Sequence, residues 1–453
     1  MKKAFSAFAM ATGALGQLLS GEASAEFLKD SKLSLSTRNF YYNQDTRNEN
    51  GLSNTPRFDE WGQAFTVDYR SGFTEGKVGF GLDLLGLYGI RLDDGGRAGK
   101  PGEDRQPGSV FPLESNGKAT RGFGRLGVTA KMRFSNTLVQ YGTLKPKLPV
   151  VIANDGRLLP QTYEGGQVTV NEIKDLTFIA GKLEHSSERN SSNRDSLSIE
   201  GSNNRSNSLH QESNEFYYGG FDYKPMKNLL AQYYYGELKD FYKQHFFGLI
   251  HDLALPAGSL KTDLRYFYSE SDGENSSRSG RAEGYRAAGY WGTGDSHRYE
   301  VDNKLWSAMF TYSLGGHQIG AGYQKITGKS DFPHLNQGGG RVLYLITDAQ
   351  MHKFHNSGEN TWVAKYAYDF AAIGVPGLKA SLTYLSGDDI DDSGSDKKEW
   401  ERDTRLDYVF QDGMLKGLGL TWMYGVWRGN DTNPGSRDKD ENRLIANYTL
   451  PIF

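Results

Sequence analysis

"GKVGFGLDLLGLYGIRL", residues 76–92, alternates between two kinds of side chain along its length. One set of alternate positions is apolar, namely Val78, Phe80, Leu82, Leu84, Tyr88 and Ile90. The other set is mostly small or charged, namely Gly79, Gly81, Asp83 and Arg91, with Leu85 and Leu87 as exceptions. Successive side chains of a β-strand point to opposite faces of the sheet. The stretch therefore predicts a strand with one apolar face and one polar face.

The same alternation returns in "GRLGVTAKMRF" (124–134) and in "SLKTDLRYFY" (259–268). In a soluble β-sandwich the apolar face would form the core, whereas in a transmembrane barrel it would face lipid. The alternation alone favours neither architecture, because both need one apolar face.

The lengths of the connections between strands separate the two architectures. Expected strands at 32–42, 61–71, 76–91, 120–134, 137–144 and onward are joined alternately by long segments and short turns. The long segments include 43–60, 92–119, 187–212, 271–298 and 328–358, and the short turns include 71–76, 313–318 and 372–377. Outer-membrane barrels alternate in this way because tight turns lie at the periplasmic rim and long loops at the outer rim. We therefore expect an all-β, transmembrane antiparallel β-barrel of about 18 strands, with one hairpin around 233–247 left open.

The amino-terminal segment and the composition favour an exported protein. Lys2 and Lys3 precede an apolar run that ends in Ala-Ser-Ala at 23–25, which is typical of a secretory signal peptide. We expect a signal peptide over 1–25 and a barrel domain over 26–453, located in the bacterial outer membrane. The chain of 453 residues contains no Cys, and its formal net charge of −3 indicates no nucleic-acid partner.

"KLPVVIANDGRLLPQTYEG", residues 147–165, is unusually apolar for a connection between strands. Pro149 and Pro160 exclude the interior of a strand or a helix. We expect the third loop, about 145–163, to fold inward as a constriction loop and to pack its apolar side chains on the inner wall. Arg157 should then face the passage, and Tyr163 should stand beside it as a gate.

The polar face of the expected strands gives the charges of the lumen. Its basic residues are Arg38, Arg70, Arg125, Lys131, Arg133, Arg265, Lys365 and Arg405, and its acidic residues are Asp68, Asp83, Asp263, Asp369, Asp403 and Asp407. A row formed by Arg125, Lys131 and Arg133 would attract a carboxylate and pass it from site to site. The alternative is that the lumen charges pair with one another and only hydrate the wall.

Other motif-like stretches do not indicate enzyme chemistry. "DDGGRAGKPG" (93–102) lacks the spacing of a phosphate-binding loop, and in "DDIDDSGSD" (388–396) the position of a calcium-binding Glu falls on Trp400. The nine His residues form no zinc-binding or hydrolase pattern. We expect no catalytic residue, no metal site and no cofactor.

Six stretches carry a resemblance to a known family: "LSTRNFYYN" (35–43), "EWGQAFTVDYRSGFTEGKVGFGLD" (60–83), "RLLPQTYEG" (157–165), "AGYQKITG" (321–328), "YDFAAIGVPGL" (368–378) and "DENRLIANYTLPI" (440–452). With them, the chain resembles the OprD family of substrate-specific outer-membrane porins of pseudomonads. The resemblance implies 18 strands and passive uptake of small carboxylate-bearing nutrients. It also implies a pore narrowed by the third and seventh loops and lined by a ladder of arginines.

The resemblance transfers to the ladder positions only in part. Lys131 and Arg133 match the first basic strand of the ladder, and Lys365 stands at a position that is usually Arg. The residues that resemble the remaining ladder positions are not basic, namely Thr383, Thr421 and Met423, and three acidic residues lie near them, namely Glu401, Asp403 and Asp407.

Our first hypothesis is a porin for amino acids or for aromatic or aliphatic acids. The expected pore and substrate-binding residues are Arg38, Arg125, Lys131, Arg133, Arg157, Tyr163, Lys365, Asp403, Arg405 and Asp407. The alternatives are a chitooligosaccharide-type sugar porin, in which Tyr and Trp residues stack on the sugar, and a barrel hydrolase. The expected partners are a small-molecule substrate, outer-membrane lipid and lipopolysaccharide, and the barrel-assembly machinery. The protein is expected to be a monomer or a weak trimer.

Overall fold

The computed structural model describes residues 29–46, 57–93, 95–200, 209–336, 340–392, 397–430 and 438–453. The expected signal peptide at 1–25 lies outside the described residues. No helix among these segments is long and apolar enough to cross a membrane.

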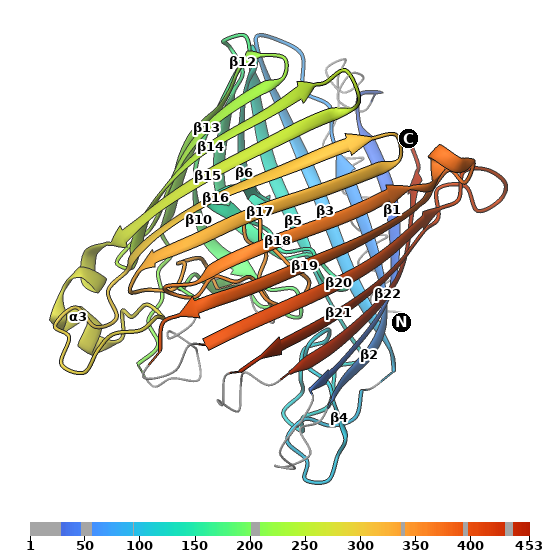
Figure 1. Cartoon of the computed structure of the whole chain (residues 1–453). Coiled ribbons are helices and arrows are strands. Elements are labelled where there is room, and N and C mark those ends of the chain that lie inside the picture. Colours follow the sequence, from blue (N-terminus) through green and yellow to red (C-terminus); the bar gives the residue numbers. More distant parts are fainter. Residues whose placement is uncertain are drawn as a thin grey trace.

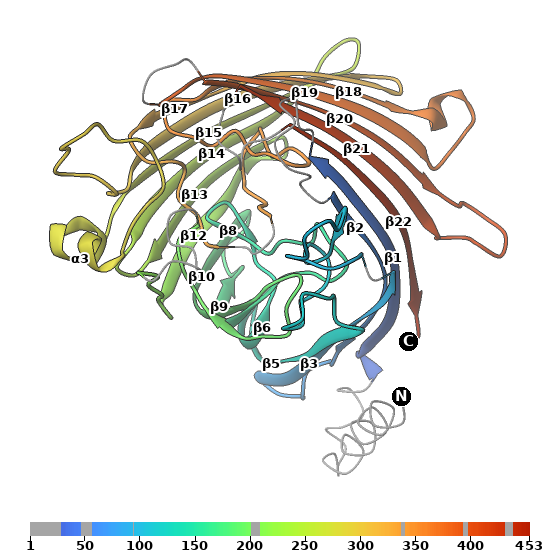
Figure 2. The ribbon, with the colours of Figure 1, turned by 90° about the horizontal axis from the view of Figure 1, so that it is seen from below.

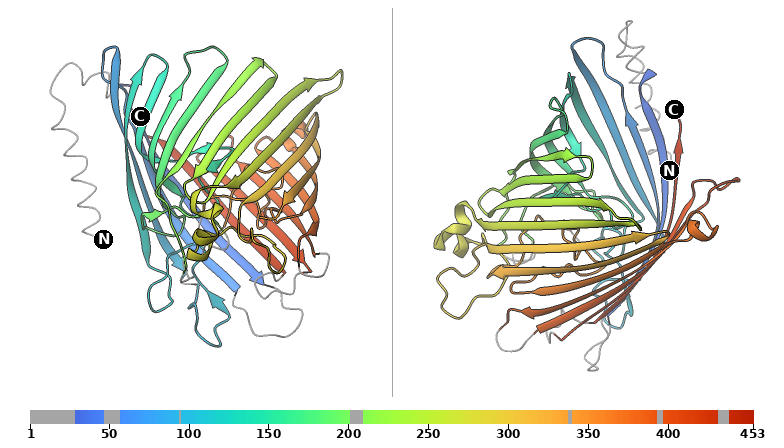
Figure 3. Two further views of the ribbon diagram at one scale, coloured as in Figure 1. Left: turned by 90° about the vertical axis from the view of Figure 1, so that its left-hand side faces the viewer. Right: turned by 45° about the horizontal axis from the view of Figure 1, so that its top comes forward.

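The chain forms a closed antiparallel β-barrel, which confirms the expected fold class (Figure 1). Eighteen strands make the wall: β1 (Lys32–Thr46), β2 (Arg57–Arg70), β3 (Val78–Asp93), β5 (Gly122–Phe134), β6 (Thr137–Leu144), β9 (Thr162–Val170), β10 (Leu176–Ser187), β12 (Phe216–Met226), β13 (Leu229–Leu238), β14 (Tyr242–Ala254), β15 (Ser259–Ser271), β16 (Asp302–Leu314), β17 (His317–Gly328), β18 (Asn360–Asp369), β19 (Leu378–Ile390), β20 (Lys397–Val409), β21 (Gly419–Gly429) and β22 (Lys439–Pro451). Each pairs with the next, and β1 pairs with β22 from Ser34 with Pro451 to Thr46 with Lys439, which closes the ring. Figure 3 shows the wall from two further sides.

The described connections contain a few short elements. These are β4 (Arg105–Gln106), β7 (Lys147–Leu148), β8 (Val151–Ile152), β11 (Asp195–Ser196), the short helices η1 (Gly273–Ser276) and η2 (Phe370–Ile373), and the helix α3 (Arg278–Glu283). The hairpin that the sequence left open consists of β13 and β14, joined by only three residues, 239–241. This outer connection is an exception to the predicted alternation of long and short connections, and the outer connection between β19 and β20, residues 391–396, is also short.

The alternation in β3 places its apolar residues toward lipid. Phe80 is 57% exposed and Tyr88 is 48% exposed on the outer face. On the inner face, Leu87 is buried and Leu85 packs beside it against the side chains of loops inside the barrel. The two leucines that broke the sequence pattern are therefore explained by these loops.

The third outer connection, residues 145–161, lies inside the ring of strands and is called L3 (Figure 2). Its Leu158 packs over Gly62 and Gly89 on the β2–β3 side. Its Val150 packs over Gly236 on β13. L3 therefore runs between two separate parts of the inner wall, and glycines make room for it at both. The inward fold expected from its two prolines and its apolar residues agrees with these contacts.

Substitution of one glycine on each face of β3 tests the packing of L3. A Cβ at Gly89 would lie 2.9 Å from a ring carbon of Phe123 and 3.1 Å from a methyl of Leu158, whereas one at Gly86, on the opposite face of β3, would meet nothing closer than 3.7 Å. We expect Gly89→Val to lower the free energy of unfolding by about 1–3 kcal/mol, because it overpacks the inner face. Gly86→Val should change it by less than about 0.5 kcal/mol. Urea unfolding in lipid vesicles measures both, and equal losses would contradict the packing.

Candidate functional site

Four arginines converge on the tip of L3, and we call them the arginine cluster. They are Arg38 on β1, Arg157 in L3, Arg189 at the start of the fourth outer connection (188–215, called L4) and Arg443 on β22. All four lie against the backbone of residues 155–157. Because L3 crosses the lumen, the cluster lies inside the barrel.

Arg38 is the member of the cluster with the most open surface. Its guanidinium makes two hydrogen bonds to the Asp155 carboxylate, Nη1 to Oδ1 at 2.9 Å and Nη2 to Oδ2 at 3.3 Å. Nη1 also donates to the Arg157 carbonyl at 2.7 Å. The side chains of Arg38 and Asp155 are 26% and 59% exposed, so the pair borders solvent. Arg38 therefore presents the paired donor geometry that binds carboxylates.

Arg157 does not face the passage, and that expectation was wrong. It is 5% exposed, its guanidinium lies 4.1 Å from the centre of the Tyr42 ring, and its Nη2 donates to the Tyr42 hydroxyl at 3.1 Å. Burial lowers the pKa of its guanidinium. The side chain turns toward the wall because Tyr42 offers both a ring face and a hydroxyl. Arg157 therefore does not contact the passage, and it contributes to the lumen only through its electrostatic potential.

Arg189 and Arg443 complete the cluster behind the tip of L3. Arg443 pairs with Glu441, with Nε to Oε1 at 2.6 Å, and its Nη2 donates to the Gln350 carbonyl at 2.9 Å. Arg189 is buried, and burial beside Arg157 and Arg443 holds its pKa well below the ordinary value. These two arginines were missed in the sequence. L4 reads as a polar surface loop, whereas Arg443 shares the inner face of β22 with Glu441 and could have been found from that alternation.

The cluster gathers four guanidiniums at the tip of L3. Arg38 pairs there with Asp155, and Arg443 pairs with Glu441. Like charges held close together in a poorly solvated site strengthen the attraction for an anion. The tip of L3 is therefore a candidate site for a negatively charged group.

Tyr163 is not a gate, because it belongs to the wall. It is the second residue of β9, pairs across the sheet with Leu144 and is fully buried in a cluster with Leu148 and Phe216. L3 ends at Gln161, earlier than the sequence suggested. The alternation of side chains along β9 then points Tyr163 inward, into the buried cluster between the wall and L3. It cannot open or close a passage from that position.

Arg125, Lys131 and Arg133 share the inner face of β5, but they do not form one continuous row. Arg125 donates to the carbonyls of Glu188, Ser191 and Pro160, so it holds L3 and L4 against the wall. Lys131 pairs with Asp83 at 2.6 Å. Arg133 is exposed and forms no ion pair with a described residue.

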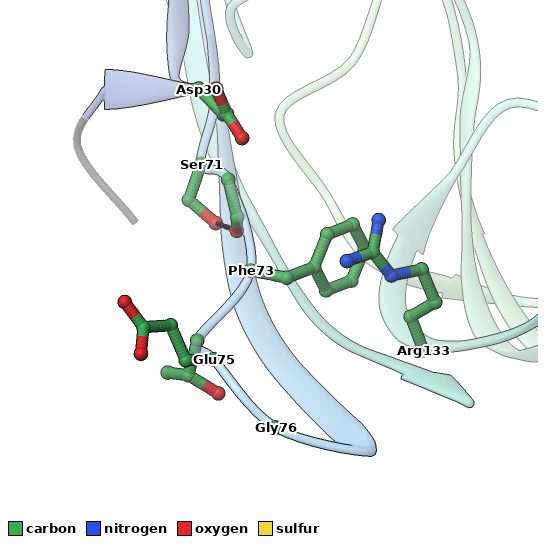
Figure 4. A pocket seen from close by; sticks show the side chains of 8 residues that line it. Asp30, Ser71, Phe73, Glu75, Gly76 and Arg133 are labelled. Carbon is green, nitrogen blue, oxygen red and sulfur yellow. Dashed lines mark hydrogen bonds between the residues drawn. The ribbon is translucent and has the colours of Figure 1, made fainter. Parts of the chain in front are cut away.

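Arg133 lines a cavity of about 390 Å³ at the periplasmic mouth (Figure 4). The turn between β2 and β3 covers the inner face of β3, where a Cβ at Gly79 would meet the Phe73 side chain at 2.9 Å. From this turn Phe73 reaches toward β5, with its ring centre 4.5 Å from the Arg133 guanidinium and 4.9 Å from the Lys131 ammonium. Cations over an aromatic face are stabilised by the ring quadrupole. The turn therefore narrows this end of the lumen and holds two cations there.

The remaining expected residues lie on β18 and β20 and meet the seventh outer connection, 329–359, called L7. Lys365 donates to the Ile346 carbonyl at 3.1 Å, and Asp403 accepts from the Gln350 amide at 2.9 Å. Glu401 accepts from the amides of Met351 and His352, whereas its sequence position indicates only an acidic neighbour of the expected ladder positions. These side chains fix L7 inside the barrel.

Arg405 and Asp407 lie on β20 nearer its periplasmic end, and they pair with each other at 2.6 Å. For these two residues the structure agrees with the alternative in which lumen charges pair and hydrate the wall. Among the described residues, no group of three or more acidic or His side chains is arranged to hold a metal ion.

The large aromatic rings on the inner face are buried under the loops. They include Phe40, Tyr42, Phe123, Tyr163, Phe216, Tyr218, Tyr234, Tyr242, Phe246, Phe267 and Trp427. The strongly exposed rings stand on the outer face, for example Phe80, Tyr141, Trp306 and Trp362. The described lumen therefore offers few open ring faces on which a sugar could stack.

Comparison with known proteins agrees with this architecture. Residues 25–452 match the family described as outer membrane porin, OprD family. The chain is 33% identical to the porin-like protein GalP of Pseudomonas putida, over 98% of this chain and 97% of that protein. It is 30% identical to porin D of Pseudomonas aeruginosa, over 96% and 94% of the two chains.

Two solved structures from Pseudomonas aeruginosa extend the comparison. OccK8 (OprE) superposes with a TM-score of 0.86 and is 54% identical, covering 95% of this chain and 100% of that one. OpdK, crystallised with vanillate, superposes with a TM-score of 0.79 and is 31% identical, covering 94% and 100%.

A closed barrel of 18 strands with loops folded into its lumen is the architecture of an outer-membrane porin, and a porin is a passive channel. The chain belongs to the OprD family of outer membrane porins and is located in the bacterial outer membrane. Because the similar proteins named above are porins, the barrel-hydrolase alternative is set aside.

Proposed function

We propose that this porin admits small organic molecules bearing a carboxylate, and that the carboxylate binds at the tip of L3. The observation that carries the proposal is the arginine cluster, in which four guanidiniums gather at the tip of L3, Arg38 paired with Asp155 and Arg443 with Glu441. Arg38 supplies the accessible donors, and the three buried arginines raise the positive potential around it.

Asp155 has a specific role in this proposal. Its carboxylate already occupies the two donors of Arg38 that an incoming carboxylate would use. An entering acid therefore exchanges with Asp155, whose exposed carboxylate is solvated by water while it is displaced, and Asp155 pairs with Arg38 again when the acid leaves. Such exchange keeps binding weak enough for permeation, which a channel requires.

The related porin OpdK supports the proposed substrate class, because it was crystallised with vanillate, which is an aromatic carboxylate. We propose that Arg125, Arg157 and Lys365 act as positioning residues that hold the loops, and that Lys131 and Arg133 attract the anion at the periplasmic mouth. Asp403 would hold L7 through the Gln350 amide, Arg405 and Asp407 would hydrate the wall, and Tyr163 would only support L3. Contact with lipopolysaccharide, insertion by the barrel-assembly machinery and a monomeric or weakly trimeric state remain expectations.

Uptake into liposomes tests the carboxylate preference. We expect the porin-dependent uptake, measured as the excess over protein-free liposomes, to be faster for benzoate than for benzyl alcohol, which has the same ring without the charge, and to be slow for chitobiose. Arg38→Gln should raise the half-saturation concentration for benzoate about tenfold, because it removes a charge-assisted pair of hydrogen bonds.

The matched control is Arg70→Gln, which removes a lumen guanidinium that is already paired with Asp68 at 3.0 Å. This change should leave benzoate uptake nearly unaltered. Equal uptake of benzoate and benzyl alcohol by the unmodified porin would refute the proposal. Faster uptake of chitobiose than of either ring compound would favour the sugar alternative.

A further inference from the structure

Two neighbouring turns at the periplasmic rim expose large apolar side chains. Residues 370–377 join β18 to β19, and residues 410–418 join β20 to β21. We call these two turns the apolar foot. Their exposed residues are Ile373 (64%), Val375 (41%), Met414 (99%) and Leu415 (49%). The channel function assigns no role to them.

Both turns begin with the same pair of packed aromatic rings at the lipid-facing side of the barrel. Phe370 packs edge-to-face on Tyr368 with ring centres 4.9 Å apart, and Phe410 packs in the same way on Tyr408, also at 4.9 Å. Each Tyr lies on the face of its strand that points away from the lumen. Aromatic rings at strand ends mark the membrane interface of a barrel, so the foot begins at that level.

The two turns form one structural unit. The Val409 amide donates to the Gly377 carbonyl at 3.0 Å, and a Cβ at Gly377 would meet the side-chain amide of Gln411 at 2.5 Å. Gly377 has a φ of +90°, which a residue with a side chain rarely adopts. Figures 1 and 3 show both turns, in orange and orange-red, extending past the neighbouring strand ends.

The foot carries more exposed apolar side chains than the other short turns of the same rim. The turns between β5 and β6, β12 and β13, and β16 and β17 consist of Ser135–Asn136, Lys227–Asn228 and Gly315–Gly316, which are polar residues or glycine. The turns 171–175 and 255–258 expose one large apolar side chain each, Ile173 (64%) and Leu255 (37%). Four large apolar side chains within two adjoining turns would expose apolar surface at a cost of about 25 cal/mol per Å² if they stayed in water.

We propose that the apolar foot inserts into the inner leaflet of the outer membrane, with phospholipid as its partner. The foot continues directly from the lipid-facing rings, so the acyl chains that cover those rings also reach Ile373 and Met414. Lys416 follows Leu415 and forms no ion pair with a described residue, which leaves its ammonium for a lipid phosphate. The foot thereby fixes the depth of the β18–β21 side of the barrel.

Site-specific fluorescence tests this proposal, because the chain has no Cys and a single one can be introduced cleanly. Met414→Cys and the control Asn136→Cys each replace an exposed turn residue, so neither change should disturb the fold. Each is labelled with an NBD fluorophore and reconstituted in vesicles of phosphatidylethanolamine and phosphatidylglycerol. We expect the label at 414 to emit at shorter wavelength, to be quenched by nitroxide-bearing lipid, and to be several-fold less quenched by iodide than the label at 136.

Equal iodide quenching at both positions would overturn the proposal, since the foot would then lie in water. A label at 414 that neither quencher reaches would also overturn it, because the foot would then pack against a second copy of the chain. Dilution of the protein in the vesicles separates that outcome from lipid contact: lipid quenching should not depend on protein density.

Discussion

A channel in which Pro146–Gln161 is replaced by Asn-Gly should conduct ions at least about threefold better than the unmodified porin, since an 18-stranded barrel without an inner loop holds a wide aqueous channel. The replacement is compatible with the wall, because Leu144 and Tyr163 are already cross-strand partners. Lys145 and Thr162 would form the next pair, and Asn-Gly is a favoured two-residue hairpin turn. Single-channel recording in planar bilayers measures the change.

The control removes Gly292–Gly294 from the sixth outer connection, where added side chains at both glycines would meet nothing within 4 Å. Its conductance should be unchanged. Retention of the heat-dependent shift in gel mobility would verify that both barrels fold. If the variant with the shortened L3 folds and conducts as the unmodified porin does, L3 does not narrow the pore.

The architecture could be predicted from the sequence because strand alternation and connection length are local properties. Residues 76–92 predicted an apolar outer face, and β3 has one. The prolines of residues 147–165 predicted a loop that packs inward, and Leu158 and Val150 make those contacts. Even the exceptions Leu85 and Leu87 carried information, since they mark where the inner face meets loops.

The site could be predicted only in part, because its geometry depends on segments distant in sequence. Arg38 was correctly placed on the inner face, but its partner Asp155 is 117 residues away. Arg157 turns to Tyr42, and Arg189 comes from a polar loop whose path no local pattern defines. Tyr163 was misplaced because a strand boundary shifted from the expected position, which changed the side chain from loop to wall.

If the arginine cluster binds carboxylates as proposed, the unmodified porin should prefer anions, and Arg38→Glu should make it prefer cations. The change removes one positive charge and adds a negative one beside Asp155. Two carboxylates would then face the passage in place of the ion pair between Arg38 and Asp155. Selectivity follows the potential at the narrowest part of a pore. The reversal potential across a planar bilayer in a potassium chloride gradient reports the preference directly.

That reversal potential, compared with the one for Arg70→Glu, shows whether the arginine cluster sets the selectivity of the pore. Both variants change the lumen charge by the same amount, but Arg70 lies near the periplasmic end of β2 and is already paired with Asp68. We expect the potential to change sign for Arg38→Glu and to shift only slightly for Arg70→Glu. Equal shifts, or an unchanged sign for Arg38→Glu, would contradict the assignment of the arginine cluster as the site that selects the substrate.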